Sequence, residues 1–164
     1  MTRTVVATLM GLLVTATGCV ATSNGTAIVP ERAIADFNGS WSVEWCDRAD
    51  PDLDCGGFSV TLVQDGSHIC GGFGGALVNL RQVDEGDVVG RVDGDTAILE
   101  VRSGRNDAIV RVRARRVGGD LHWEQDGTVR RGGPDIDVIA FDDVLKPATV
   151  DRRRVPKACD APSS

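Results

Sequence analysis

Apolar and polar side chains alternate along most of the chain from residue 37 onward, in short runs separated by clusters of Gly, Asp and Asn. A period of two residues is typical of β-strands, because successive side chains of a strand point to opposite faces of its sheet. The turn residues between the runs indicate antiparallel hairpins. Strands are predicted over residues 41–45, 58–62, 68–83 with an interruption, 88–92, 97–102, 108–117, 121–125 and 136–141.

Three of the separating clusters predict particular backbone features. Asp93-Gly94 predicts a tight hairpin turn. The acidic run Asp84-Glu85-Gly86-Asp87 predicts a second turn, because Asp and Gly favour turn conformations. The glycines at 71, 72, 74 and 75 predict a bulge or a loop that interrupts the third strand.

These elements predict an all-β domain, and their short connections favour an eight-stranded antiparallel up-and-down barrel. An open sheet of eight strands would leave two unpaired edges, whereas closing the sheet pairs both of them. A β-sandwich is the alternative fold. We expect the barrel domain to occupy residues 37–145 and a C-terminal tail to follow at residues 146–164.

The first residues form a separate segment. Arg3 precedes an uncharged, mostly apolar run from Thr4 to Gly18 that is too short to span a bilayer. Small residues then lead directly into Cys19. This segment resembles the signal peptide and lipobox of bacterial lipoproteins, which implies cleavage after residue 18 and lipidation of Cys19. Residues 19–36 are then expected to form a lipidated, flexible tether.

The same resemblance carries an expectation about location. Lipoproteins with Asp after the lipidated cysteine tend to stay in the inner membrane, and this chain has Val20 there. We therefore expect a lipid anchor in the outer membrane that holds the domain on its periplasmic face. If the segment is an ordinary secretory signal instead, the protein is soluble in the periplasm or secreted.

Charge narrows the classes of partner. The sequence holds 18 basic and 24 acidic residues, and loss of Arg3 with the signal segment leaves 17 basic residues and a formal charge of −7. An acidic surface repels the phosphates of nucleic acids, so we expect no nucleic-acid partner.

Four cysteines follow Cys19, and an even number in an exported domain predicts two disulfides. Up-and-down strand polarity places Cys46 and Cys55 on one loop at one end of the barrel and Cys70 at the other end. We therefore expect the pairs Cys46–Cys55 and Cys70–Cys159. The cysteine and histidine spacings match no metal motif, and no metal or other cofactor is expected.

Two side-chain sets could mediate binding. Trp41, Trp45 and Trp123 share the inward parity of their strands, so they form either the core of the barrel or a pocket for a small apolar ligand at one mouth. Arg111, Arg113 and Arg115 alternate with apolar residues and should form a basic stripe on the outer face. That stripe forms either a partner surface or cross-strand pairs with carboxylates such as Glu100.

Evidence for catalysis is weak. The sequence contains no nucleophile elbow, zinc-protease motif or phosphate-binding loop, and we assign no catalytic residue. Glu44 and Glu124 would be the best carboxylate pair if they lay inside the barrel. Both alternate with tryptophans, however, which favours the outer face.

The segment Phe37-Asn38-Gly39-Ser40-Trp41 resembles the Gly-x-Trp opening of calycins, the family of lipocalin and avidin-like barrels. Further along, Trp45-Cys46, Cys55-Gly56-Gly57-Phe58 and Ile69-Cys70-Gly71 are similar to a group of bacterial envelope proteins with no assigned activity. Together these observations predict a non-catalytic envelope lipoprotein that binds a small apolar ligand or an envelope protein. The alternatives are an inhibitor or immunity protein against an envelope-targeting hydrolase, and an enzyme with carboxylates inside the barrel.

Overall fold

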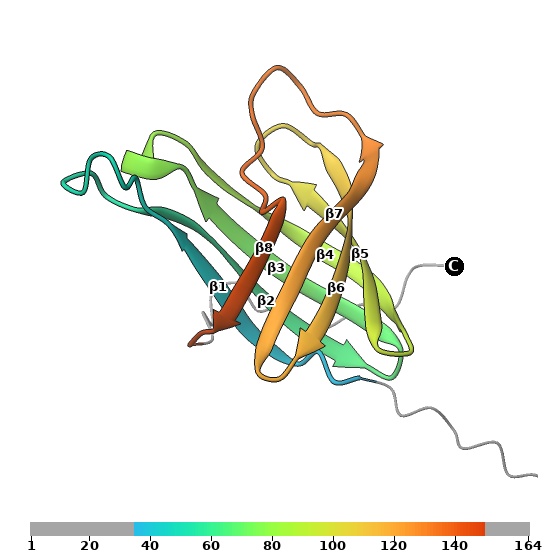
Figure 1. The fold of residues 1–164 in the computed structure, drawn as a ribbon. Helices are drawn as coiled ribbons and strands as arrows, with labels where there is room; N and C mark the ends of the chain where they lie inside the picture. Colours follow the sequence, from blue (N-terminus) through green and yellow to red (C-terminus); the bar gives the residue numbers. More distant parts are fainter. Residues whose placement is uncertain (1–34, 150–164) are drawn as a thin grey trace, which may run out of the picture. The chain divides into compact units, whose positions relative to one another are not determined.

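The computed structural model describes residues 35–149, which form a closed antiparallel barrel whose eight strands are neighbours in chain order (Figure 1). This finding confirms the predicted all-β up-and-down barrel and rules out the sandwich. Among the described residues, no helix is long and apolar enough to cross a membrane. The elements are β1 (Gly39–Trp45), β2 (Gly56–Asp65), β3 (His68–Ala76), the 3-10 turn η1 (Val78–Leu80), β4 (Val83–Asp93), β5 (Thr96–Ser103), β6 (Ile109–Val117), β7 (Asp120–Arg130) and β8 (Asp142–Pro147).

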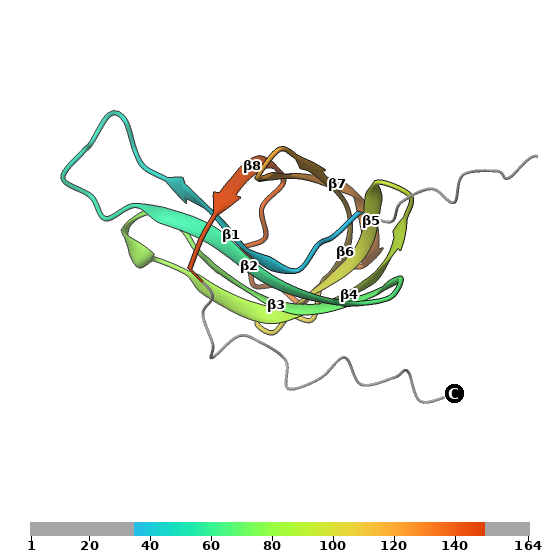
Figure 2. The same cartoon turned by 90° about the horizontal axis from the view of Figure 1, so that it is seen from below.

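The barrel closes where β8 lies between β7 and β1, as the view along the barrel shows (Figure 2). β1 pairs with β2 along its whole length, from Gly39 to Trp45. With β8 it pairs only at Trp41 opposite Pro147 and at Ser42 opposite Lys146. The two strands that complete the barrel therefore share its shortest ladder, and strand structure runs two residues past the expected domain end at 145.

The expectations for the third and fourth strands were partly wrong. β3 runs without interruption through the glycines and ends at Ala76, and the acidic run expected to be a turn lies inside β4. Each glycine of β3 is paired with β2 on one side and β4 on the other, so two ladders overcome the low strand propensity of glycine. Gly75 also makes room for residue 138, since a Cβ there would lie 2.1 Å from the Val138 carbonyl oxygen.

The last strand was also misplaced. β8 is Asp142–Pro147, whereas the whole segment predicted as a strand, residues 136–141, belongs to the connection between β7 and β8. Val138, Ile139 and Ala140 in that segment are buried. These side chains are buried because they cover one end of the barrel. They form no strand ladder, so the apolar pattern there reflects burial and not a strand.

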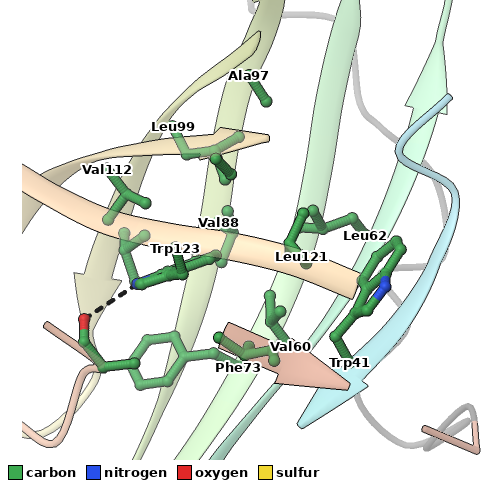
Figure 3. Close-up of a cluster of buried hydrophobic side chains, with 14 of the residues drawn as sticks. Trp41, Val60, Leu62, Phe73, Val88, Ala97, Leu99, Val112, Leu121 and Trp123 are labelled. Carbon is green, nitrogen blue, oxygen red and sulfur yellow. Dashed lines mark hydrogen bonds between the residues drawn. The ribbon is translucent and has the colours of Figure 1, made fainter. Parts of the chain in front are cut away.

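The core is the interior of the barrel. Aromatic rings pack near its centre: Phe58 stacks on Phe73 with ring centroids 5.5 Å apart and lies tilted against Trp123 at 5.2 Å. Aliphatic side chains from all the other strands fill the space around them (Figure 3). An eight-stranded barrel is just wide enough for side chains to fill it, and this one is filled in that way.

Candidate functional site

Trp41 and Trp123 are part of the barrel core, with exposures of 3% and 1%. Each indole N–H donates to a backbone carbonyl, Trp41 to Gly119 at 3.1 Å and Trp123 to Ala140 at 3.0 Å. Trp45 lies at the upper end of β1, half-buried, and its indole donates to Asp143 Oδ1 at 3.3 Å. The inward parity expected for all three is present, and the first two indoles fill the interior as a core does (Figure 3).

The lower end of the barrel, where β1 begins, is covered by the residues that precede β1. Phe37 is fully buried, and its backbone N–H donates to the side chain of Gln64 at 2.8 Å. The guanidinium of Arg116 lies 5.2 Å from the Trp41 ring and donates to the Asp36 carbonyl at 2.8 Å. These contacts place an aromatic plug and a cation over the lower opening.

The upper end is covered by the β7–β8 connection, which Asp84 holds from inside the barrel. The Asp84 carboxylate accepts hydrogen bonds from the Ser103 hydroxyl at 2.7 Å, the Arg105 N–H at 3.2 Å and the Val138 N–H at 3.1 Å. One carboxylate thereby joins β4, the end of β5 and the connection. Asn106 adds a second attachment, because its side-chain amide donates to the Asp135 carbonyl at 2.7 Å.

Sequence reasoning missed Asp84, which was assigned to a turn. It is 2% exposed, and its partner Ser103 is fully buried. One signal was available: Asp84 shares the parity of Val88 and Val92, the buried apolar residues of the same strand. That parity identifies an inward-facing carboxylate once the turn is recognised as strand.

The proposed carboxylate pair does not lie inside the barrel. Glu44 on β1 and Glu124 on β7 are both exposed and alternate with inward-facing tryptophans. The enzyme hypothesis therefore loses the two residues on which it depended, and Asp84 does not replace them because its three contacts are structural.

The arginine stripe lies on the outer face of β6, as expected. Arg113 forms an ion pair with Asp126 at 2.7 Å, and Asp126 reaches it because it is the extra residue at a bulge in β7. Arg111 lies opposite Glu100 and Arg115 opposite His122 in the strand registers. Within residues 35–149, neither of these two arginines forms an ion pair within 4.0 Å.

A surface hollow of about 210 Å³ adjoins the stripe. Arg113 and Arg115 line it together with His122, Glu124 and Asp142, so cations and carboxylates alternate across β6, β7 and β8. Such a mixed surface can form polar contacts with a protein but offers little apolar area to a small ligand.

The Cys46–Cys55 disulfide is present, with an S–S distance of 1.98 Å. This confirms the first expected pair. Cys70 is also disulfide-bonded, whereas its expected partner Cys159 lies outside the described residues, so that pairing stays a prediction. Cys19 and the rest of the signal and tether also lie outside the described residues.

Two connections project side by side from the upper end of the barrel, the β1–β2 loop and the β3–β4 connection that contains η1 (Figures 1 and 2). The backbone N–H of Asn79 donates to the Asp54 carbonyl at 2.7 Å and joins them. Asn79 and Leu80 both have left-handed backbone conformations, with φ of 61° and 49°. Such a conformation is strained for leucine, and strain of this kind concentrates at functional sites.

Within the described part of the chain, no group of three or more His, Cys, Asp or Glu side chains is arranged to hold a metal ion. Sequence comparison adds no relative. No protein-family model, curated protein sequence or solved structure matches this chain significantly.

Proposed function

We propose that this protein is a non-catalytic, membrane-anchored module of the bacterial cell envelope that binds another protein on the outside of its barrel. The observation that carries the proposal is the filled interior. Both ends are covered, by Phe37 below and by the segment around Ile139 above, and the space between them is packed. Binding must then use the outer strand faces or the connecting loops.

A small apolar ligand is the less favoured partner. To enter the barrel it would have to displace Trp41 or Trp123, and each of these donates to a backbone carbonyl that would lose its partner. Displacing Trp123 would leave the buried Ala140 carbonyl unpaired, which costs about 1–3 kcal/mol. Displacing either tryptophan would also lose the packing of an indole.

The anchor completes the proposal. The lipobox resemblance supports lipidation of Cys19 and attachment to the periplasmic face of the outer membrane. A tether of residues 19–36 would then restrict the barrel to a thin layer next to the membrane, which raises the local concentration of membrane-associated partners. At such a raised local concentration, weak contacts on the barrel surface are sufficient for binding.

The projecting loops favour a specialised form of this function, inhibition of an envelope-targeting hydrolase. An inhibitor needs a rigid protrusion that enters the cleft of its target with little loss of conformational freedom on binding. Here a disulfide closes one loop, and a backbone hydrogen bond joins it to the next.

Native mass spectrometry of the full chain, purified from its own cell envelope in mild detergent, tests the proposal. We expect complexes with another protein, and a free chain whose mass equals the polypeptide plus its covalent lipid. A chain that retains a small non-covalent ligand and no protein would refute an external protein-binding function.

A further inference from the structure

Exposed apolar side chains gather at the upper end of the barrel, on the β3–β4 connection with the first residue of β4 and on the β7–β8 connection. We call them the apolar rim: Leu77, Leu80, Val83 and Ile136, with exposures of 37%, 57%, 48% and 63%. The two connections touch, because the Gln82 side chain donates to the Ile136 carbonyl. Solvent-exposed apolar side chains grouped in this way mark interaction sites.

The rim has a rigid support. The Leu77 N–H donates to the Gln82 carbonyl at 2.9 Å, which closes the connection on itself. Gly56 allows the β1–β2 loop to touch the β3–β4 connection, since a Cβ there would lie 2.3 Å from the Ala76 carbonyl oxygen. The Cys46–Cys55 disulfide then closes the neighbouring loop.

Leu80 is the most informative residue of the rim. The surrounding structure holds it at a φ of 49°, where leucine is disfavoured, and leaves its side chain more than half exposed. Burial therefore does not account for this conformation within the described chain. A binding surface would account for it, because preorganising an apolar anchor lowers the cost of association.

Charge indicates the kind of protein that the rim fits. The adjoining acidic loop, residues 46–55, carries four aspartates and one arginine. All four aspartates are exposed: Asp47, Asp50, Asp52 and Asp54. Acidic side chains on one side of an apolar surface complement a partner that carries basic side chains beside an apolar socket, and they repel anionic lipid headgroups.

We infer that the apolar rim and the acidic loop form the docking site for a separate basic protein, with Leu80 as the residue that enters its apolar socket. This inference rests on the proposed protein-binding function and adds to it the site and the charge of the partner. The arginine stripe on β6 is the competing surface.

Photo-crosslinking in the native host tests the inference. A photoreactive residue is placed in the full chain at position 80, at position 115 on the stripe, or at position 117 on β6. We expect position 80 alone to yield an adduct with another protein, and that protein to be basic. An adduct from position 115 alone would overturn the docking site and leave the proposed function standing.

The remaining outcomes are equally decisive. An adduct between two copies of this chain would show that the chain binds a second copy of itself, and would overturn the inference of a separate partner. An acidic partner captured at position 80 would overturn its charge argument. No adduct from any position would overturn both the inference and the proposed function.

Affinity for the captured protein gives a matched comparison. Leu80→Asp should weaken binding about 30-fold or more, as loss of a central apolar anchor does. Val117 is a suitable control because it is 56% exposed, almost the same as Leu80. Val117→Asp should change affinity less than about twofold.

Leu80→Asn separates loss of binding from loss of the fold. Asparagine tolerates the left-handed conformation, so this variant should stay folded and still bind the captured protein weakly. Equal effects on affinity of the changes at 80 and 117 would refute the assignment.

Discussion

The Ser103 hydroxyl donates to the Asp84 carboxylate at 2.7 Å inside the barrel, where both side chains are buried. The same carboxylate accepts the backbone N–H of Val138, so it connects two strands to the connection that covers the upper end. A buried charged group is tolerated when protein donors satisfy it with hydrogen bonds. Without the carboxylate, the buried donors of Ser103 and Val138 would be left unsatisfied.

Removing this carboxylate should destabilise the protein. We expect Asp84→Ala to lower the free energy of unfolding by about 2–3 kcal/mol, because the buried donors of Ser103 and Val138 lose their acceptor. Asp87→Ala is the control, since Asp87 lies on the same strand and is exposed, and it should change stability by less than about 0.5 kcal/mol. Urea unfolding followed by tryptophan fluorescence measures both, and equal stabilities for the two variants would contradict the role of Asp84.

The strained backbone at Leu80 predicts that a substitution there can stabilise the protein. Leu80→Gly should raise the free energy of unfolding by about 0.5–1 kcal/mol, because glycine adopts a left-handed backbone at no steric cost. Leu77→Gly is the matched control: Leu77 has an extended backbone with φ of −74°, and glycine there should destabilise through its greater freedom in the unfolded chain. Thermal unfolding of the two variants measures the difference, and a loss of stability in both would mean that Leu80 is unstrained.

Asp107 should titrate below the usual range of an aspartate. Arg102 donates a hydrogen bond to its carboxylate at 2.9 Å, and this bond, with the charges of Arg102 and Arg130, lowers the pKa of Asp107. Arg102→Gln should raise that pKa toward its ordinary value, as carboxyl-detected NMR titration would show. Because the pKa is lowered on folding, the pair stabilises the protein above about pH 4 and loses that effect as the pH falls further. An unchanged pKa in the variant would contradict the pairing.

Much of the fold followed from the sequence because alternation reports which side chains face inward. Trp41 and Trp123 were assigned to the interior on parity alone, and the structure places them there. The loop disulfide followed from strand polarity in the same way.

Errors arose where two physical causes produce one sequence pattern. Val138, Ile139 and Ala140 are apolar because they cover the barrel end, and burial alone cannot distinguish such a cover from a strand. The residues around Gly86 have the composition of a turn, but Gly86 pairs with β3 on one side and β5 on the other. That pairing depends on the neighbouring strands and not on the local sequence. The strain at Leu80 had no signal, since a left-handed leucine depends on contacts formed after folding.

Lipidation of Cys19 stays a prediction, and it has a simple test. Cells fed an alkyne-labelled fatty acid should incorporate the label into the full chain, which should fractionate with membranes. Cys19→Ser should abolish both labelling and membrane association, because no other lipid attachment is expected. A wild-type chain that is unlabelled and remains soluble would establish ordinary secretion instead.

Amide hydrogen exchange of the full chain tests the central claim most directly, when the chain in its own envelope membranes is compared with the purified chain. External binding at the projecting loops predicts slower exchange in the membranes, confined to residues 46–55, 77–83 and the rim around Ile136. Exchange in β3 and β7 should stay unchanged, because the interior is already filled. Slower exchange throughout those strands without protection of the loops would indicate a ligand inside the barrel and would contradict the account.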